Sequence, residues 1–439
     1  MRTAQILAWV LGGSVVAGSA CGGDDDHGYL AERASEVREL PLLADVDVVE
    51  KSREEYSAEA EEYAASITDE DLREYADTYG RLGFFPQSLD LRPIIAGSSS
   101  DWVGASYSPA GGQITLVGQA RDDTIVHEYV HALQDQHFDL YDYDDYETSD
   151  GFLARRAVVE GDAVLAEGRF VMQEEYGEDL DSVYWPGLFA DYREFSVGLL
   201  EESGYPSIFM DYPTFCYTYG IEYTAHNLTG VSIDDPAALQ PGPYDWTREN
   251  DLFTDRPPAT TQQILRLDDT DPIVDVGLVD PPALLANRLT AVDRDVFGEW
   301  YSYLLFFEID RDVAAARALA ALWDGDRAMF VSDRETLARG VVWASAWDDE
   351  AAATAVAVTM WRLYGVAVDP EAPVEPSGAS AIDGEPLWIE QRGARVVVIK
   401  NVDPAIAPDL ADASFGPATQ IRVTRARPSL AELLQFAHE

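Results

Sequence analysis

Two histidines one helical turn apart constrain this chain more than any other feature, because residues 127–131 read His-Glu-Tyr-Val-His. Side chains at positions i and i+4 project from the same face of an α-helix, so His127 and His131 can bind one metal ion together. A helix is predicted over residues 122–138, and apolar residues of the kind found in buried helices surround the motif: Ile125, Val126, Val130 and Leu133. The pattern therefore predicts a buried metal centre, and zinc is the metal that this spacing favours.

Glu128 is a candidate general base, a role that the two histidine ligands cannot fill. One residue after His127, it is rotated by about 100° around the helix, so it can reach a metal-bound water without binding the metal. Zinc lowers the pKa of such a water towards about 7, and Glu128 would accept its proton while the water attacks a polarised carbonyl. Glu128 would then return the proton to the leaving amine. We therefore predict a zinc hydrolase with Glu128 as the general base.

Glu160 is the predicted third zinc ligand. On a helix expected from about 150 to 177, it shares one stripe with apolar residues: Leu153, Ala157 and Val164. A carboxylate on an apolar stripe is costly unless it is paired or bound to a metal ion. Gly161 beside it allows another backbone to approach closely. The alternative for this carboxylate is a buried salt bridge to Arg155 or Arg156, which would leave the metal centre incomplete.

His137 is the competing third ligand. It follows His127 by ten residues, which is the histidine spacing of the metzincin motif HExxHxxGxxH. Gln134, however, stands where that motif has the glycine that ends the helix. Without this glycine the helix is expected to continue, so that His137 points away from the metal. Glu160 is preferred, and His137 stays as the alternative.

Two segments carry a family resemblance. Residues 126–139 read VHEYVHALQDQHFD and residues 156–163 read RAVVEGDA. Together they resemble gluzincin-type metallopeptidase-like surface lipoproteins of bacteria and haloarchaea, with similarity over roughly residues 40–400. In one departure, Arg266 stands where that family often has a histidine. The resemblance implies a zincin-like fold and gives the ligand and base roles to the residues already named, His127, His131, Glu160 and Glu128.

The charge balance excludes several classes of partner. The chain has 80 acidic and 30 basic residues, for a net charge of −50. A surface of this kind repels nucleic acid and anionic membranes. Despite this charge, 47% of the residues are hydrophobic, which is typical of a globular protein and not of a disordered chain. The expected partner is a peptide or protein substrate.

The N-terminus is expected to lie outside the fold. Residues 1–20 are similar to a lipoprotein signal peptide, with Arg2 before an apolar run that is too short to span a bilayer comfortably. The run ends in Gly-Ser-Ala-Cys, which resembles a bacterial lipobox, so Cys21 is predicted to carry a lipid. Residues 21–45 are predicted to form a tether. The protein is thus expected outside the cytoplasm, anchored to a membrane of the cell envelope, and plain secretion is the alternative.

The order of the predicted elements indicates an α+β fold in three parts, and the resemblance implies that this fold is zincin-like. A mixed α/β lobe (46–148) carries the HExxH helix, a mainly helical lobe (149–325) carries the third ligand, and a small α+β part (326–439) follows. The leading hypothesis is a zinc-dependent metallopeptidase. The alternative is a non-catalytic acidic surface or binding lipoprotein that retains the fold. The intact Glu128 favours the enzyme, because a decayed enzyme is expected to lose its general base early.

Two local predictions complete this picture. Residues 86–97 are expected to form a loop. Tyr217 and Tyr219 are candidates for hydrogen-bond donors to a tetrahedral oxyanion, although tyrosines in such a context more commonly pack in a core.

Overall fold

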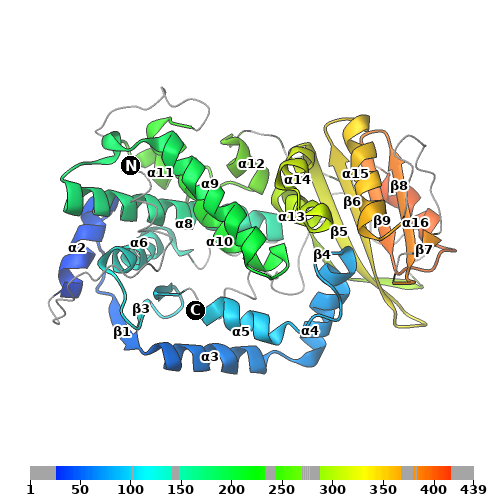
Figure 1. Ribbon diagram of the computed structural model, residues 1–439, viewed down its shortest axis with the longest axis horizontal. Coiled ribbons are helices and arrows are strands. Elements are labelled where there is room, and N and C mark those ends of the chain that lie inside the picture. The colour runs from blue at the N-terminus through cyan, green and yellow to red at the C-terminus, as the bar shows by residue number, and fades with distance from the viewer. Residues whose placement is uncertain are drawn as a thin grey trace.

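The protein is described here by a computed structural model, in which residues 26–100, 103–140, 148–232, 244–268, 287–366, 379–380 and 383–416, together with 270, 272, 274 and 276, are placed. Helices form its centre, a small sheet lies near the HExxH helix, and a larger sheet closes the opposite end (Figure 1). The predicted α+β class is confirmed. The predicted signal peptide and Cys21 lie outside the described residues.

The first lobe has helices around a small sheet. Its strands are β1 (Asp47–Lys51), β2 (Ala105–Ser108) and β3 (Gln113–Val117). Its helices are α2 (Asp26–Arg38), α3 (Arg53–Ser66), α4 (Asp69–Tyr75), the π-helical turn η1 (Ala76–Gly80), α5 (Arg92–Ser100) and α6 (Asp122–Phe138). The bounds of α6 are those predicted for the metal-motif helix.

The second part of the chain is helical. Its long helices are α8 (Ser149–Val171), α9 (Trp185–Glu202), α10 (Asp211–Thr229) and α13 (Gly298–Asp310). Shorter helical segments lie among them, namely η2 (Met172–Tyr176), η3 (Leu180–Ser182), η4 (Ser207–Met210), α11 (Thr247–Asn250), α12 (Thr261–Arg266) and α14 (Val313–Ala320).

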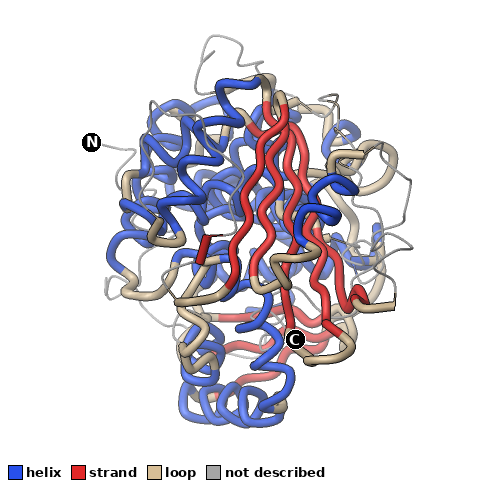
Figure 2. Tube along the Cα trace, turned by 90° about the vertical axis from the view of Figure 1, so that its right-hand side faces the viewer, coloured by secondary structure: helices blue, strands red, loops and turns tan. Residues whose placement is uncertain are grey.

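The third part is built on a six-stranded antiparallel sheet in the order β4-β5-β6-β9-β8-β7, which faces the viewer in Figure 2. Its elements are β4 (Leu289–Asp295), β5 (Trp323–Asp333), β6 (Arg339–Trp347), α15 (Glu350–Leu363), β7 (Ala379–Ser380), β8 (Pro386–Arg392), β9 (Arg395–Lys400) and α16 (Ala407–Ser414). Both faces of β6 are buried, because Trp343 belongs to the large core shared with α13 and α15, and Val342 belongs to a second core with α16.

Three predictions about the chain's organisation are wrong. Residues 26–38 form helix α2 instead of a tether, and its apolar stripe, which includes Leu30 and Ala34, is buried in a core with residues of α6 and α8. The expected loop over 86–97 contains the start of α5, whose Ile94 and Ile95 are buried in the large core. The boundary between residues 325 and 326 falls inside β5, and the sheet already begins with β4.

The small sheet has the order β1-β3-β2, so β2 is an edge strand. It runs antiparallel to β3, with Tyr107 opposite Ile114, and the carbonyl of Gly104 accepts a hydrogen bond from the N–H of Val117 at 2.9 Å. Hydrogen-bonded pairs alternate along an antiparallel ladder. The backbone groups of Ala105 and Tyr107 therefore face outward, away from β3.

Helices α8 and α10 touch backbone to backbone. A Cβ atom added to Gly161 of α8 would lie 2.2 Å from the carbonyl carbon of Gly220 of α10, and one added to Gly220 would lie 2.2 Å from the carbonyl oxygen of Ala157. The expected close approach at Gly161 is therefore confirmed. It brings the first half of α10 close to the middle of α8, where Glu160 lies.

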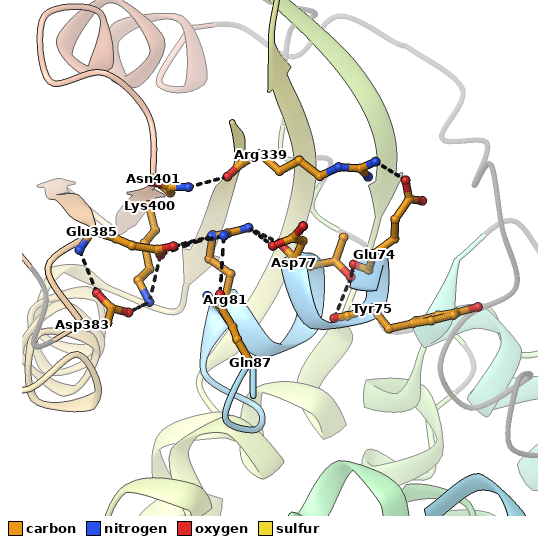
Figure 3. Close-up of polar contacts among 11 residues, drawn as sticks. Glu74, Tyr75, Asp77, Arg81, Gln87, Arg339, Asp383, Glu385, Lys400 and Asn401 are labelled. Atoms are coloured by element: carbon orange, nitrogen blue, oxygen red, sulfur yellow. Dashed lines mark hydrogen bonds and ion pairs between the residues drawn. The ribbon is translucent and has the colours of Figure 1, made fainter. Parts of the chain in front are cut away.

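Charged side chains join the first lobe to the large sheet (Figure 3). Arg81, just after η1, is 3.0 Å from a carboxylate oxygen of Asp77 and 3.0 Å from one of Glu385. On the sheet, Lys400 pairs with Asp383 at 2.6 Å, and Arg339 forms an ion pair with Glu74 of α4. Of these side chains, Glu74, Asp77, Arg81 and Arg339 line a polar pocket of about 360 Å³.

Candidate metal centre

The three predicted ligands converge. The Nε2 atoms of His127 and His131 are 3.0 Å apart, and Oε2 of Glu160 lies 3.2 Å from the first and 3.5 Å from the second. All three side chains are buried, and one ligand atom from each lies within 4.8 Å of the others. Within the described part of the chain, no other group of three His, Cys, Asp or Glu side chains is so arranged. The group offers a metal ion two imidazole nitrogens and one carboxylate oxygen.

The two carboxylate oxygens of Glu160 contact different groups. Oε2 faces the histidines, whereas Oε1 accepts a hydrogen bond from Nη2 of Arg156 at 3.0 Å and another from the hydroxyl of Tyr212. Burial raises the pKa of this carboxyl, but His131, His127 and Arg156 together hold it well below its usual value. Glu160 is therefore ionised, with one oxygen directed at the metal-binding group.

A second carboxylate lies behind His127. Oε2 of Glu167, on α8, is 3.1 Å from Nδ1 of His127, on the side of the ring opposite to the Nε2 atom that faces Glu160. Burial lowers the pKa of His127, but hydrogen bonds to Glu160 and Glu167 raise it well above its usual value. Glu167 thus orients the ring and increases the basicity of Nε2, as outer-shell carboxylates do for metal-bound histidines.

Glu128, the predicted general base, is buried next to the candidate ligands. Burial beside the two histidines on α6 raises the pKa of its carboxyl, with Glu160 adding to the effect. The two histidines and a hydrogen bond from the backbone N–H of Tyr107 act in the opposite direction. That N–H is one of the outward-facing groups of β2, so the edge of the small sheet runs next to Glu128.

The two candidate tyrosines, Tyr217 and Tyr219, lie in different environments. The Tyr217 ring stacks on the His127 ring with a centroid distance of 6.1 Å, and burial and the nearby carboxylates Glu160 and Glu128 raise the pKa of its phenol well above the usual value. Tyr219 instead contacts Trp300, with ring centroids 5.4 Å apart, and its hydroxyl accepts a hydrogen bond from Arg317. Only Tyr217 of the pair belongs to the metal centre.

His137 does not join the group. Helix α6 continues to Phe138, as expected without the metzincin glycine, and Nε2 of His137 lies 2.8 Å from the carbonyl oxygen of Pro41. Its ring is therefore used to attach the chain segment after α2 to the end of α6. The alternative third ligand is thus not supported by the geometry.

Several residues that contact the candidate ligands were not predicted from the sequence as part of the site. Glu167 could have been found, because it follows Glu160 by seven residues and so falls on the same helical stripe. Gln134 follows His131 by three residues and was judged only by the glycine it replaces. Arg156 enters the sequence-based prediction only as a salt-bridge partner that would compete with a metal for Glu160. Tyr212 gave no signal, because its contact with Glu160 depends on how α10 crosses α8.

Comparisons with known proteins address a different part of the chain. Residues 287–413 match a family described as a domain of unknown function (DUF8575). This segment contains the six-stranded sheet and α13 to α16, whereas the metal-binding group lies outside it. No curated protein and no solved structure matches the chain significantly.

Proposed function

We propose that this protein is a zinc-dependent metallopeptidase of the gluzincin type. The observation that carries the proposal is the buried group of His127, His131 and Glu160, with Glu128 next to the two histidines on the same helix. Catalytic zinc sites in proteins use three protein ligands and leave one position for water or substrate. Two histidines and a glutamate are one of the ligand sets that such sites use.

The charges around the group fit a divalent cation. Three buried carboxylates, of Glu128, Glu160 and Glu167, surround the histidines, and Arg156 is the cation paired with one of them. Buried carboxylates are costly without compensating positive charge. Without a metal, His127, whose pKa is raised, shares this role with Arg156. A bound zinc ion would supply the charge in place of that proton, polarise a substrate carbonyl and make a water acidic enough to act as a nucleophile near neutral pH.

The roles of the surrounding residues follow from their positions. Glu128, whose pKa is raised by burial, accepts a proton from the attacking water and later gives it to the leaving amine. Tyr217, whose phenol keeps its proton, donates a hydrogen bond to the oxygen of the carbonyl under attack. Arg156 and Glu167 hold Glu160 and His127 in place.

The edge of β2 supports a peptide as substrate. The backbone groups of Ala105 and the carbonyl of Tyr107 face outward beside Glu128, which itself accepts the Tyr107 N–H. An extended peptide can add to such an edge through main-chain hydrogen bonds, which makes recognition independent of the side-chain sequence. We therefore place the peptide backbone along β2, with one carbonyl next to Glu128.

The cellular setting remains part of the proposal. Within the described residues no helix is both long and apolar enough to cross a membrane. If Cys21 carries the predicted lipid, helix α2 begins at Asp26. Five residues span at most about 18 Å, so the folded protein would stay close to the membrane surface.

Metal analysis and peptide cleavage test the proposal. The purified chain is expected to hold one zinc ion per molecule and to cleave members of a broad peptide library. Glu128→Gln should keep the zinc but lose at least about 100-fold in cleavage, a typical contribution of a general base. The exposed Glu175 provides the matched variant, and Glu175→Gln should cleave like the wild type.

Each result decides between the two hypotheses. A wild-type protein without zinc would rule out the metallopeptidase. Zinc binding with equal cleavage by wild type and Glu128→Gln would instead support the acidic binding lipoprotein.

A further inference from the structure

We propose that Gln134 is a positioning residue that presents Nε2 of His131 to the metal by fixing the tautomer of its ring. The inference rests on the metal centre of the proposed function and adds a residue to it. Gln134 is on α6, one turn after His131, and is completely buried. Its Oε1 lies 2.9 Å from Nδ1 of His131.

The orientation of the Gln134 amide follows from its other contacts. Its Nε2 is 3.0 Å from the carbonyl oxygen of Val159 and 2.8 Å from Oδ2 of Asp162. A carbonyl and a carboxylate only accept hydrogen bonds, so the NH₂ group must face them. The oxygen of the amide is left to face His131, and Nδ1 of His131 must then carry the hydrogen. In the neutral ring, Nε2 consequently keeps its lone pair and faces His127 and Glu160.

A buried arginine, Arg38, fixes the position of Asp162 and thereby of Gln134. Nε of Arg38, at the end of α2, donates to Oδ2 of Asp162 at 2.7 Å, and both side chains are fully buried. Nη2 of Arg38 also donates to Asn250 at 2.8 Å, and its guanidinium lies over the ring of Trp246 at 4.6 Å. The buried charge of Arg38 thus holds the Asp162 carboxylate next to Gln134.

The two histidines are thus positioned by different chemistry. His127 has a carboxylate, Glu167, behind Nδ1, whereas His131 has a neutral amide. A fourth carboxylate at this point would stand close to Asp162 and add negative charge to a buried group that already has three glutamates. The glutamine orients the ring without adding to that charge.

Gln134→Met tests the role, because methionine has a similar length but makes no comparable hydrogen bond. In the full chain, competition with a chelator should show a zinc affinity about 10- to 100-fold below that of the wild type. The ¹⁵N shifts of the metal-free protein should show that His131 has lost its preference for the Nδ1–H tautomer. Gln136→Met is the matched control, since Gln136 is on the same helix but bonds to the backbone of Leu43 and Ala44.

Gln134→Glu provides the rescue. As a carboxylic acid it retains one oxygen that accepts from His131 and one O–H that donates to Asp162. Its zinc affinity should lie between those of the wild type and Gln134→Met, with the wild-type tautomer of His131. If Gln134→Met does not fold, Gln134→Glu carries the test, and wild-type zinc affinity in a variant that has lost the Nδ1–H tautomer would overturn the proposal.

Two further results would overturn the inference. One is a Gln134→Met protein with wild-type zinc affinity and the wild-type tautomer. The other is an equal loss of affinity in Gln134→Met and Gln136→Met, which would show a general effect on α6. If the wild type binds no zinc, the proposed function fails, but the tautomer in the metal-free chain still decides the role of Gln134.

Discussion

Arg156 donates a hydrogen bond from Nη2 to Oε1 of Glu160 at 3.0 Å, and this contact leaves Oε2 directed at His127 and His131. From the sequence, a salt bridge and a metal ligand were competing roles for this glutamate. The structure is compatible with both roles at once, because a carboxylate has two oxygens and each can serve one role. The guanidinium compensates the buried charge and fixes the carboxylate plane, so Oε2 stays directed at the two histidines.

Zinc affinity should therefore depend on Glu160 and not on His137. Glu160→Gln is expected to lower the affinity by more than about 100-fold, because losing a ligand costs more than losing an outer hydrogen-bond partner. Arg156→Met should lower it by about 10-fold, since the carboxylate stays but is no longer oriented. His137→Ala should bind zinc like the wild type. Chelator competition measures all three, and loss of affinity only in His137→Ala would overturn the ligand assignment.

Gly161→Ala should strongly destabilise the protein. The added methyl group would lie 2.2 Å from the carbonyl carbon of Gly220, so α8 and α10 would have to move apart. Overpacking of this kind typically costs about 1–3 kcal/mol, and the contact here is with rigid backbone. Gly168→Ala is the matched control, because nothing lies within 4 Å of its added Cβ. Chemical denaturation should show Gly168→Ala at least as stable as the wild type, and equal effects of both variants would contradict the packing argument.

The sequence predicted the clustering of His127, His131 and Glu160 better than the parts of the fold that surround them. The spacing of His127 and His131 is a local property of one helix, and the stripe position of Glu160 is also local. Arg38 pairs with Asp162 across 124 positions of the chain, so its role depends on packing that no short pattern encodes. Helix α2 lies in the segment predicted as a tether, because the residues that directly follow Cys21 are Gly and Asp.

Arg38→Met should destabilise the protein far more than a similar change elsewhere on α2. The substitution leaves Asp162 as a buried carboxylate without its cation, which typically costs about 3–5 kcal/mol. Arg33→Met is the comparison, because Arg33 pairs with Glu174 closer to the solvent, where an ion pair contributes about 0–1 kcal/mol. Urea denaturation of the two variants measures the difference. Similar midpoints would mean that the Arg38 ion pair does not hold α2 in place.

Asp150, in the first turn of α8, should make the protein less stable as the pH rises. Its Oδ1 accepts hydrogen bonds from the N–H and hydroxyl of Thr261 at 2.8 and 2.6 Å, but burial, with Asp326 and Asp295 nearby, raises its pKa to about 8. The ordinary value is 3.8. Between these values the folded protein binds a proton that the unfolded chain releases, so the stabilisation is complete below about pH 4 and is lost as the pH rises through 8.

Asp150→Asn removes this dependence, because the amide stays neutral at every pH. The difference in unfolding free energy between wild type and Asp150→Asn should change by a few kcal/mol between pH 5 and 9, in the direction that favours the variant at high pH. Asp211→Asn is an informative comparison. Burial raises the pKa of Asp211 to about 7, so its contribution should be lost about one pH unit earlier. A difference that does not vary with pH would show that Asp150 is already ionised in the folded protein.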